Sequence, residues 1–276
     1  MVSHAMSMRV YSGPRTDRRR GGSGGFIRML PWILALATIL SQIAWPLSSG
    51  GARDALTLTA VVLFFLTSAS HALLTRGPIW ALGWLVISGG IGFLAELLGT
   101  RTGFPFGDYA YAAGLGPVVA GVPLVIPLAW AMMSYPALLA ARRLGRGPLV
   151  TPLIAAVALA SWDLFLDPQM VAEGRWTWTM HDALTLRGIE SVPVMNFVGW
   201  LLVSLVLMLV LDRLPRRRGD GSTGDGVPAL MFLWTYISCV VLNAAFLHRP
   251  GVALWGGVAM GLVAIPYMVA LWTARD

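Results

Sequence analysis

The stretch Pro193–Asp212, PVMNFVGWLLVSLVLMLVLD, holds no charged residue before its last position. A helix of this length covers the ~30 Å hydrocarbon core of a bilayer at about 1.5 Å per residue. Similar apolar runs recur along the chain, so the sequence predicts an all-α, polytopic integral membrane protein with about eight transmembrane helices. The predicted spans are residues 29–47, 56–74, 79–98, 117–141, 149–166, 193–212, 228–247 and 252–273.

Composition supports this fold class. Of the 276 residues 57% are hydrophobic and only 12% are charged, against roughly 25% charged in soluble domains. Once the apolar runs are removed, no soluble domain of useful size is left. We therefore expect one transmembrane helical domain over residues 28–276. Residues 1–27, rich in Gly, Ser and Arg, are expected to form a disordered basic cytoplasmic tail.

The net charge of +7 comes from arginine alone, since the chain contains no lysine. With a cytoplasmic N-terminus, fifteen arginines fall in inner segments and five in outer segments, as the positive-inside rule requires. This distribution predicts a multi-pass protein of the inner (plasma) membrane with both termini cytoplasmic. It argues against a nucleic-acid-binding face. The single cysteine, Cys239, lies in an apolar run and is expected to be a packing residue.

Carboxylates collect near the predicted outer ends of the spans. Asp163 and Asp167 are four residues apart, which places both on one face if the helix continues to Pro168. Two carboxylates so placed favour holding one proton between them, as a general acid requires. The alternative is that Asp167 caps a turn before Pro168 while Asp163 pairs with Arg101 or Arg175.

Two other polar residues lie within spans. Glu96 is costly there unless it faces a cavity or a partner, and the alternative is that it snorkels to the headgroups. Asn196 could orient a water or hold a carboxyl group, or it could join two helices by a hydrogen bond. His71, in the second span, is expected to be a packing histidine. No residue spacing indicates a metal site, and no cofactor motif is present.

The connection TGFPFGDYAY, residues 102–111, is unusual for a linker. Its glycines permit a sharply folded backbone and its proline stiffens it, while Asp108 stands among aromatic residues. An interfacial aromatic belt is the alternative explanation for the rings here and at Trp176 and Trp178. Acids, an amide and many rings suit proton transfer to an apolar alkene. The resulting tertiary carbocation would be stabilised by up to ~2 kcal/mol per ring, and then hydrated or cyclised.

Several motifs are similar to those of a known family. The chain resembles the carotenoid biosynthesis membrane proteins, a family that includes carotenoid hydratases, over about residues 90–212. The similarity rests on the following stretches: GTRTGFPFGDYAY (99–111), LGP (115–117), GVPLVIPLAW (121–130), DLFLDPQM (163–170), GRWTW (174–178) and GIESVPVMNFVGW (188–200).

The resemblance implies cofactor-independent hydration of the terminal double bond of an acyclic carotenoid dissolved in the bilayer. Membrane lipid and other pathway enzymes are then the candidate partners. On this reading the Asp163/Asp167 pair supplies the acid, and Glu96 or Asp108, with Asn196, positions the water. A carotenoid end-group cyclase and a non-catalytic carotenoid-binding or transport protein are the rival readings. The rings expected to line the substrate pocket are Phe104, Phe106, Tyr109, Tyr111, Trp130, Trp162, Trp176 and Trp178.

Overall fold

The structure is a computed structural model that describes residues 23–180, 183–215 and 223–273. Most of the predicted basic tail, residues 1–22, lies outside the described residues. The last five residues of that predicted tail, 23–27, belong to the first helix, because α1 begins at Ser23.

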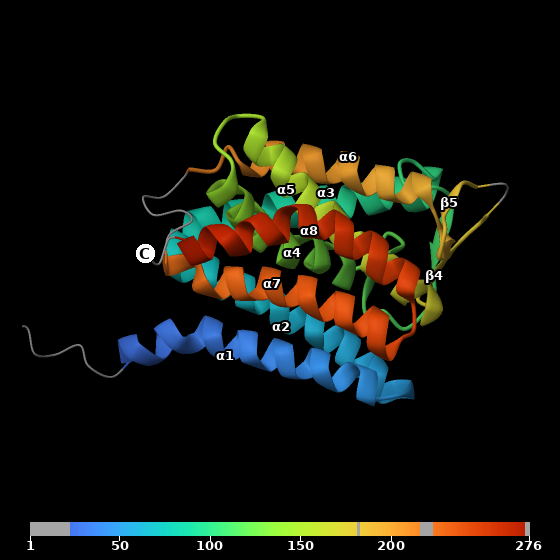
Figure 1. The fold of residues 1–276 in the computed structure, drawn as a ribbon, viewed down its shortest axis with the longest axis horizontal. Coiled ribbons are helices and arrows are strands. Elements are labelled where there is room, and N and C mark those ends of the chain that lie inside the picture. The colour runs from blue at the N-terminus through green and yellow to red at the C-terminus, as the bar shows by residue number, and fades with distance from the viewer. Residues whose placement is uncertain (1–22, 181–182, 216–222, 274–276) are drawn as a thin grey trace, which may run out of the picture.

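Eight helices of the described chain are long and apolar enough to cross a membrane, which confirms the predicted all-α polytopic fold. They run side by side along the long axis of the molecule (Figure 1). A 3-10 turn, η1 (Trp45–Leu47), extends α1, and a π-helical turn, η3 (Leu242–Phe246), extends α7. The helices are α1 Ser23–Ala44, α2 Gly50–Arg76, α3 Pro78–Thr102, α4 Val125–Leu144, α5 Val150–Ala172, α6 Val194–Leu211, α7 Gly226–Val241 and α8 Pro250–Trp272.

Helices α4 and α5 form the centre of the bundle. Helix α4 contacts α2, α3, α5, α7 and α8, and α5 contacts α6 and α8. Alanines at the contacts, among them Ala137 and Ala141 of α4 and Ala155 and Ala158 of α5, are fully buried. Small residues let helices approach closely in a bilayer, where packing rather than water exclusion drives their association. The two central helices therefore provide the rigid frame on which the polar residues described below are placed.

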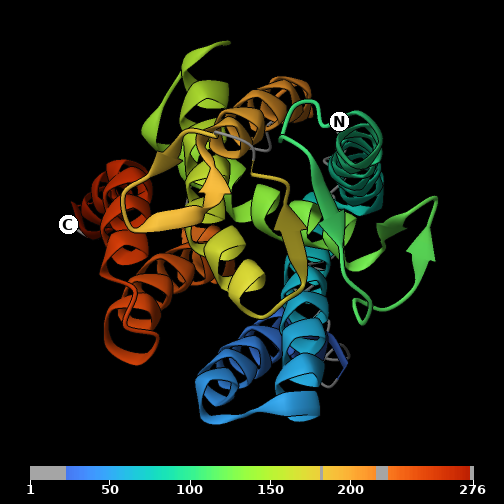
Figure 2. The same cartoon turned by 90° about the vertical axis from the view of Figure 1, so that its right-hand side faces the viewer.

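Six short strands lie together at one end of the bundle, here called the strand end (Figures 1 and 2). Strand β1 pairs antiparallel with β4, and Tyr109 and Tyr111 stand opposite Trp178 and Trp176. Side chains alternate along a strand, so all four rings lie on the same face of the β1–β4 pair. The strands are β1 Tyr109–Tyr111, β2 Val118–Val119, β3 Val122–Pro123, β4 Trp176–Trp178, β5 Thr185–Leu186 and β6 Ile189–Pro193.

Several predicted spans have different boundaries in the structure, and the fourth and fifth differ where the polar residues lie. The fourth was expected over residues 117–141, but residues 118–123 form the β2–β3 hairpin and the helix begins at Val125. The fifth was expected to end at residue 166, yet α5 continues through Pro168 to Ala172. A proline removes one backbone donor, and the following turn still forms, since the Glu173 amide donates to the Gln169 carbonyl at 3.0 Å.

The end of the bundle opposite the strands, here called the arginine end, is held by ion pairs. Arg142 of α4 donates to Asp212 at 2.9 Å, and Arg76 of α2 donates to Asp225 at 2.6 Å. All four side chains are largely buried. Each pair joins two segments that are distant in the sequence. Both ends of the described chain also lie at this end (Figure 1).

Candidate functional site

The β1–β4 pair forms one wall of a small cavity, here called the acid cavity, at the strand end of the bundle. The cavity leaves about 30 Å³ for the centres of water molecules, and a buried water needs roughly 10–15 Å³ on this measure. There is thus room for water beside two carboxyl groups and an amide. The lining residues are Glu96, Phe106, Tyr109, Tyr111, Ile126, Ala129, Trp130, Leu166, Asp167, Trp176, Trp178, Asn196 and Trp200.

Glu96 points into this cavity from α3 and is only 4% exposed. Its Oε2 accepts hydrogen bonds from the hydroxyls of Tyr109 at 2.5 Å and Tyr111 at 2.6 Å, and its Oε1 accepts one from Trp130 Nε1 at 3.0 Å. Burial raises the pKa of both phenols, so the two hydroxyls stay protonated and donate. The side chain therefore faces inward and does not snorkel to the headgroups.

Two glycines of α3 make this arrangement possible. Gly92 and Gly99 lie one turn before and one turn after Glu96, on the same face of the helix. A Cβ added at Gly92 would lie 2.7 Å from Trp130 Cγ, and one at Gly99 would lie 2.8 Å from the Tyr109 hydroxyl. Side chains at either position would displace the groups that bind Glu96. The two glycines of α3 therefore leave the space in which three hydrogen-bond donors reach the Glu96 carboxylate.

Asp163 and Asp167 lie on the same face of α5, one turn apart, and Asn196 of α6 bridges them. Asn196 Nδ2 donates to Asp163 Oδ2 at 2.8 Å and also to a carboxylate oxygen of Asp167. Asp167 lines the cavity, whereas Asp163 lies behind it and is fully buried. Within the described residues Asp163 Oδ1 has no hydrogen-bond partner, and neither acid contacts Arg101 or Arg175.

Seven aromatic residues line the acid cavity and contact one another. Trp130 and Trp200 stack with their centroids 3.9 Å apart. Tyr109 contacts Trp178 at 5.7 Å, and Tyr111 contacts Trp176 edge-on at 5.6 Å. Phe106 closes the ring set between Tyr109 and Trp200. The faces of aromatic rings carry the negative part of the ring quadrupole, so a cation formed over such a face beside the carboxyl groups would be stabilised.

Not every predicted site residue reaches the cavity. Six of the eight predicted rings line it, but the Phe104 side chain is 54% exposed. Asp108 is also exposed, because its carboxylate folds back over the backbone of Gly103. Trp162 lies behind Trp200, with its ring edge-on at 6.2 Å. The cavity therefore contains neither Asp108 nor Phe104.

The prediction also missed residues of the cavity wall. Trp200 follows Asn196 by one helical turn, so the i, i+4 spacing could have placed it on the same face. Ile126 and Ala129 enter from the start of α4, and the span predicted over residues 117–141 did not indicate which side of that helix faces the acids. Nothing in the sequence indicated that Leu166 lines the cavity, because apolar residues occur on every face of a transmembrane helix.

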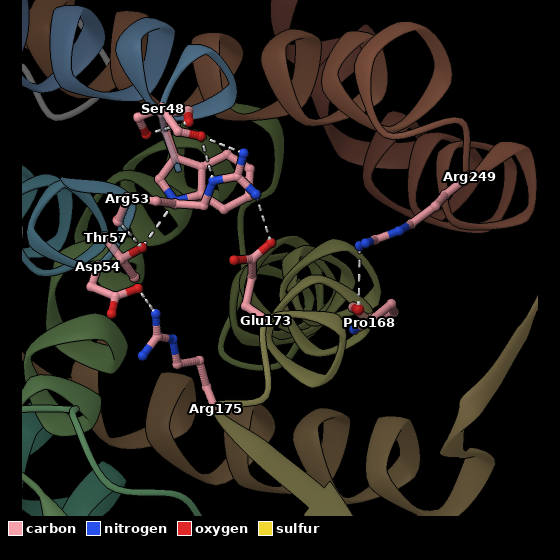
Figure 3. Close-up of polar contacts among 9 residues, drawn as sticks. Ser48, Arg53, Asp54, Thr57, Pro168, Glu173, Arg175 and Arg249 are labelled. Carbon is pink, nitrogen blue, oxygen red and sulfur yellow. Dashed lines mark hydrogen bonds and ion pairs between the residues drawn. The ribbon is translucent and has the colours of Figure 1, made fainter. Parts of the chain in front are cut away.

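Ion pairs fix the end of α5 beside the cavity (Figure 3). Arg53 of α2 donates to Glu173 at 3.2 Å, and Arg175 donates to Asp54. Arg249, at the start of α8, lies 3.4 Å from the Pro168 carbonyl that follows Asp167. These contacts hold the last turn of α5 and the start of β4 in place. Two of the three arginines are thereby paired with acids outside the cavity, and the third contacts a backbone carbonyl.

Two other polar candidates lie away from the cavity. His71 lies among the polar groups of the arginine end, with Nδ1 2.8 Å from the Tyr135 hydroxyl and Nε2 3.2 Å from the Gly224 carbonyl. Cys239 is half-buried on α7. Across the described residues, no group of three or more His, Cys, Asp or Glu side chains is arranged to hold a metal ion.

A bundle of membrane-length helices that encloses carboxyl groups within aromatic rings defines a multi-pass membrane protein with a buried acid–aromatic site. The chain belongs to the carotenoid biosynthesis protein family, whose model matches residues 56–267. That range holds every residue of the cavity. Bisanhydrobacterioruberin hydratase of Haloarcula japonica is 32% identical over 192 residues, which cover 65% of this chain and 59% of that protein. No solved structure matches the chain significantly.

Proposed function

We propose that this protein adds water across the terminal double bond of an acyclic carotenoid end group. The observation that carries the proposal is the Asn196-bridged pair of Asp163 and Asp167 beside a ring-lined cavity with room for water. The family match and the relative named as a hydratase support the same reaction. The matched region covers only 59% of that relative's length. The substrate and the activity of the present chain are therefore proposed.

Asp167 is the proposed proton donor, since it is the member of the pair that lines the cavity. The proton adds to the less substituted carbon of the terminal alkene, and the alkene electrons form the new C–H bond. A tertiary carbocation remains. A water oxygen then bonds to this cation, and the proton that the water loses returns to the carboxylate pair. The balance is one water added, with no oxidant or reductant.

Asp163 is proposed to keep one proton available within the pair. Two carboxyl groups hydrogen-bonded to one amide nitrogen are too close for both to be charged at low cost. Asn196 holds both in place and leaves Asp167 directed at the cavity. The unpartnered Asp163 Oδ1 is the remaining acceptor through which a water could connect to the pair.

Glu96 is proposed to provide negative charge on the opposite side of the cation. Its three donors hold the carboxylate in one orientation, which an electrostatic role requires. The stacked Trp130 and Trp200 and the rings of β1 and β4 add cation–π stabilisation of up to ~2 kcal/mol each when desolvated. Charge and rings together would favour the carbocation over the neutral alkene, which is the condition for catalysis.

We further propose that the arginine end of the bundle faces the cytoplasm of the inner membrane. The excess of arginines in the connections at that end supports this orientation. The acid cavity would then lie near the outer leaflet. A reporter that is active only in the cytoplasm, fused after the last residue, is expected to be active; an inactive but stable fusion would reverse the orientation.

The test of the reaction is mass-resolved pigment analysis of membranes from a lycopene-producing bacterial host, with and without this chain. A second host supplies the longer acyclic carotenoid precursor. The expected product is heavier than its substrate by one water. An isomer of unchanged mass would indicate cyclisation instead. If the chain is present in the membrane and neither substrate changes, the hydratase proposal is wrong.

A further inference from the structure

A second, larger cavity opens on the side of the bundle, between α1, α2, α5 and α7. It leaves about 390 Å³ for the centres of water molecules, within the range of roughly 300–1,000 Å³ typical of ligand sites. Its rim is made of exposed apolar side chains, Ile43 and Leu47 from α1 and η1 and Ile237 and Val241 from α7. We call it the side groove. Its mouth therefore faces the lipid side of the bundle.

The inner end of the side groove is buried and aromatic. Phe64 of α2, Met132 of α4, and Trp162 and Met170 of α5 form it, and all four side chains are buried. Polar groups on the wall bond to one another: Trp234 Nε1 donates to Gln42 Oε1 at 2.7 Å, which also joins α7 to α1. Trp45 Nε1 donates to Thr57 at 2.9 Å. The surface left for a ligand is thus mostly apolar, with Gln169, Thr235 and Ser238 as the other polar residues of the lining.

The side groove and the acid cavity share a wall. Leu166 lines both of them. Its neighbour one turn earlier, Trp162, lines the groove and contacts Trp200 of the acid cavity edge-on. Leu166 and the Trp162–Trp200 contact therefore lie between the side groove and the acid cavity. On α5, Asp167 lines the acid cavity, whereas Trp162 and Met170 line the side groove.

We propose that the side groove binds the conjugated chain of a carotenoid and directs its end group past Leu166 toward Asp167. This inference rests on the proposed function, because it names the binding site of that same substrate. The acid cavity has room for water but not for a long chain, whereas the groove has the larger volume, a mostly apolar wall and an opening among lipid-facing side chains. The buried rings of Phe64 and Trp162 suit a flat conjugated chain, which stacks on aromatic faces.

The test measures binding apart from catalysis. Asp167→Asn, which removes the proposed acid, is produced in the lycopene host and in the host of the longer precursor, and carotenoid per purified protein is measured by absorbance. In that background Ala60→Trp on α2 and Ser238→Trp on α7 fill the groove from two sides. Ala55→Trp and Leu230→Trp are the matched controls, since they lie on the same helices outside the groove.

We expect each groove variant to retain roughly tenfold less carotenoid, the effect of losing a few apolar contacts, while both controls retain the parent amount. Elution as a single symmetric species shows that a variant is folded. The inference is overturned if folded groove variants retain as much carotenoid as the controls, if the parent retains none from either host, or if the groove variants lose phospholipid instead of carotenoid.

Failure of the binding-site inference can be distinguished from failure of the proposed hydration reaction. If the groove variants lose carotenoid although the unmodified chain yields no hydrated product, the binding site stands and the reaction is wrong. If the unmodified chain hydrates and the groove variants, made with Asp167 intact, hydrate at the normal rate, the reaction stands and the groove is not its binding site.

Discussion

Seven acids of the described chain fall into two groups that differ in their partners. Four described acids outside the acid cavity are paired with arginines at either end of the bundle: Asp212 with Arg142, Asp225 with Arg76, Asp54 with Arg175 and Glu173 with Arg53. The acids of the cavity region, Glu96, Asp163 and Asp167, bond only to neutral donors among the described residues, namely two phenols, an indole and an amide.

The difference separates structural acids from acids that are available for chemistry. An ion pair compensates for the burial of both charges and ties segments together, as at the arginine end. An intramembrane acid without a cation is costly and is retained where it faces a functional cavity. The chain holds twenty arginines, but Arg53 and Arg175 near the cavity are paired with Glu173 and Asp54, and Arg249 contacts the Pro168 carbonyl rather than an acid of the cavity. Keeping cations away from Asp167 leaves its proton available.

The largest effect is expected for Asp167→Asn. The amide has the shape of the carboxyl group but cannot give up a proton, so hydration should fall by about 10²–10⁴-fold, the range of general-acid catalysis. The matched change at a paired acid is Asp212→Asn. That variant should lose stability, by as much as ~3–5 kcal/mol for a broken buried pair, with normal activity per folded molecule.

Product formed per folded protein and thermal unfolding in detergent measure both properties. Full activity of Asp167→Asn, or of the double change of Asp163 and Asp167 to alanine at normal expression, would remove the acid from the mechanism. Equal loss of activity in Asp212→Asn would abolish the distinction between the two groups of acids.

Glu96→Gln is expected to have the next largest effect. The substitution keeps the size of the side chain but removes the negative charge and places an NH₂ group near the three donors of Tyr109, Tyr111 and Trp130. Hydration should fall by roughly 10–10²-fold through lost electrostatic stabilisation. The control is Asp54→Asn at the same end of the bundle, which should keep its rate. A Glu96→Gln enzyme that unfolds more easily yet turns over at the normal rate would make Glu96 a purely structural residue.

The sequence predicted the helices well because a span needs only length and hydrophobicity, and both are local properties. The spacing of Asp163 and Asp167 likewise predicted a shared face, since one helical turn separates them. The strands could not be predicted in the same way. YAY at 109–111 and WTW at 176–178 alternate correctly, but three residues give too weak a periodic signal, and their pairing depends on contacts across more than sixty positions of the sequence.

The positions of several site residues were predicted wrongly for a related reason. Whether Phe104, Phe106 or Asp108 points inward depends on the tight turn in which the Gly107 amide donates to the Gly103 carbonyl at 2.6 Å. Composition does not encode that direction. The fifth span was expected to end at residue 166, but contacts of Arg53 with Glu173 and of Arg249 with the Pro168 carbonyl hold a further turn of α5. Tertiary contacts decided the position of these residues.

Gly99→Ala should have a smaller effect, one that depends on packing alone. The added methyl group would lie 2.8 Å from both Phe106 Cδ2 and the Tyr109 hydroxyl, and such overpacking costs about 1–3 kcal/mol. Activity should fall by roughly tenfold as the donors of Glu96 move. Gly90→Ala on the same helix is the control, because nothing lies within 4 Å of its added Cβ. Equal unfolding temperatures for the two variants would contradict the close approach described at Gly99.

The smallest effect is expected for Tyr111→Phe, which removes one of the three donors of Glu96. One hydrogen bond to a buried acceptor contributes about 1 kcal/mol, so hydration should fall by roughly fivefold. Tyr135→Phe makes the same change at the arginine end, where the hydroxyl lies 2.8 Å from His71 Nδ1, and should leave the rate unchanged.

The pH profile tests the same donors without a mutation. Burial raises the pKa of Tyr109 and Tyr111 above the ordinary phenol value of 10.0, so both hydroxyls keep their protons as the pH rises through that value. Hydration by the unmodified chain should therefore show no alkaline loss below pH ~10 from these groups. An alkaline loss below pH 10 that disappears in Tyr111→Phe would mean that the phenol ionises. A Tyr111 phenolate could not donate, and the Glu96 carboxylate would then keep only the Tyr109 hydroxyl and the Trp130 indole as donors.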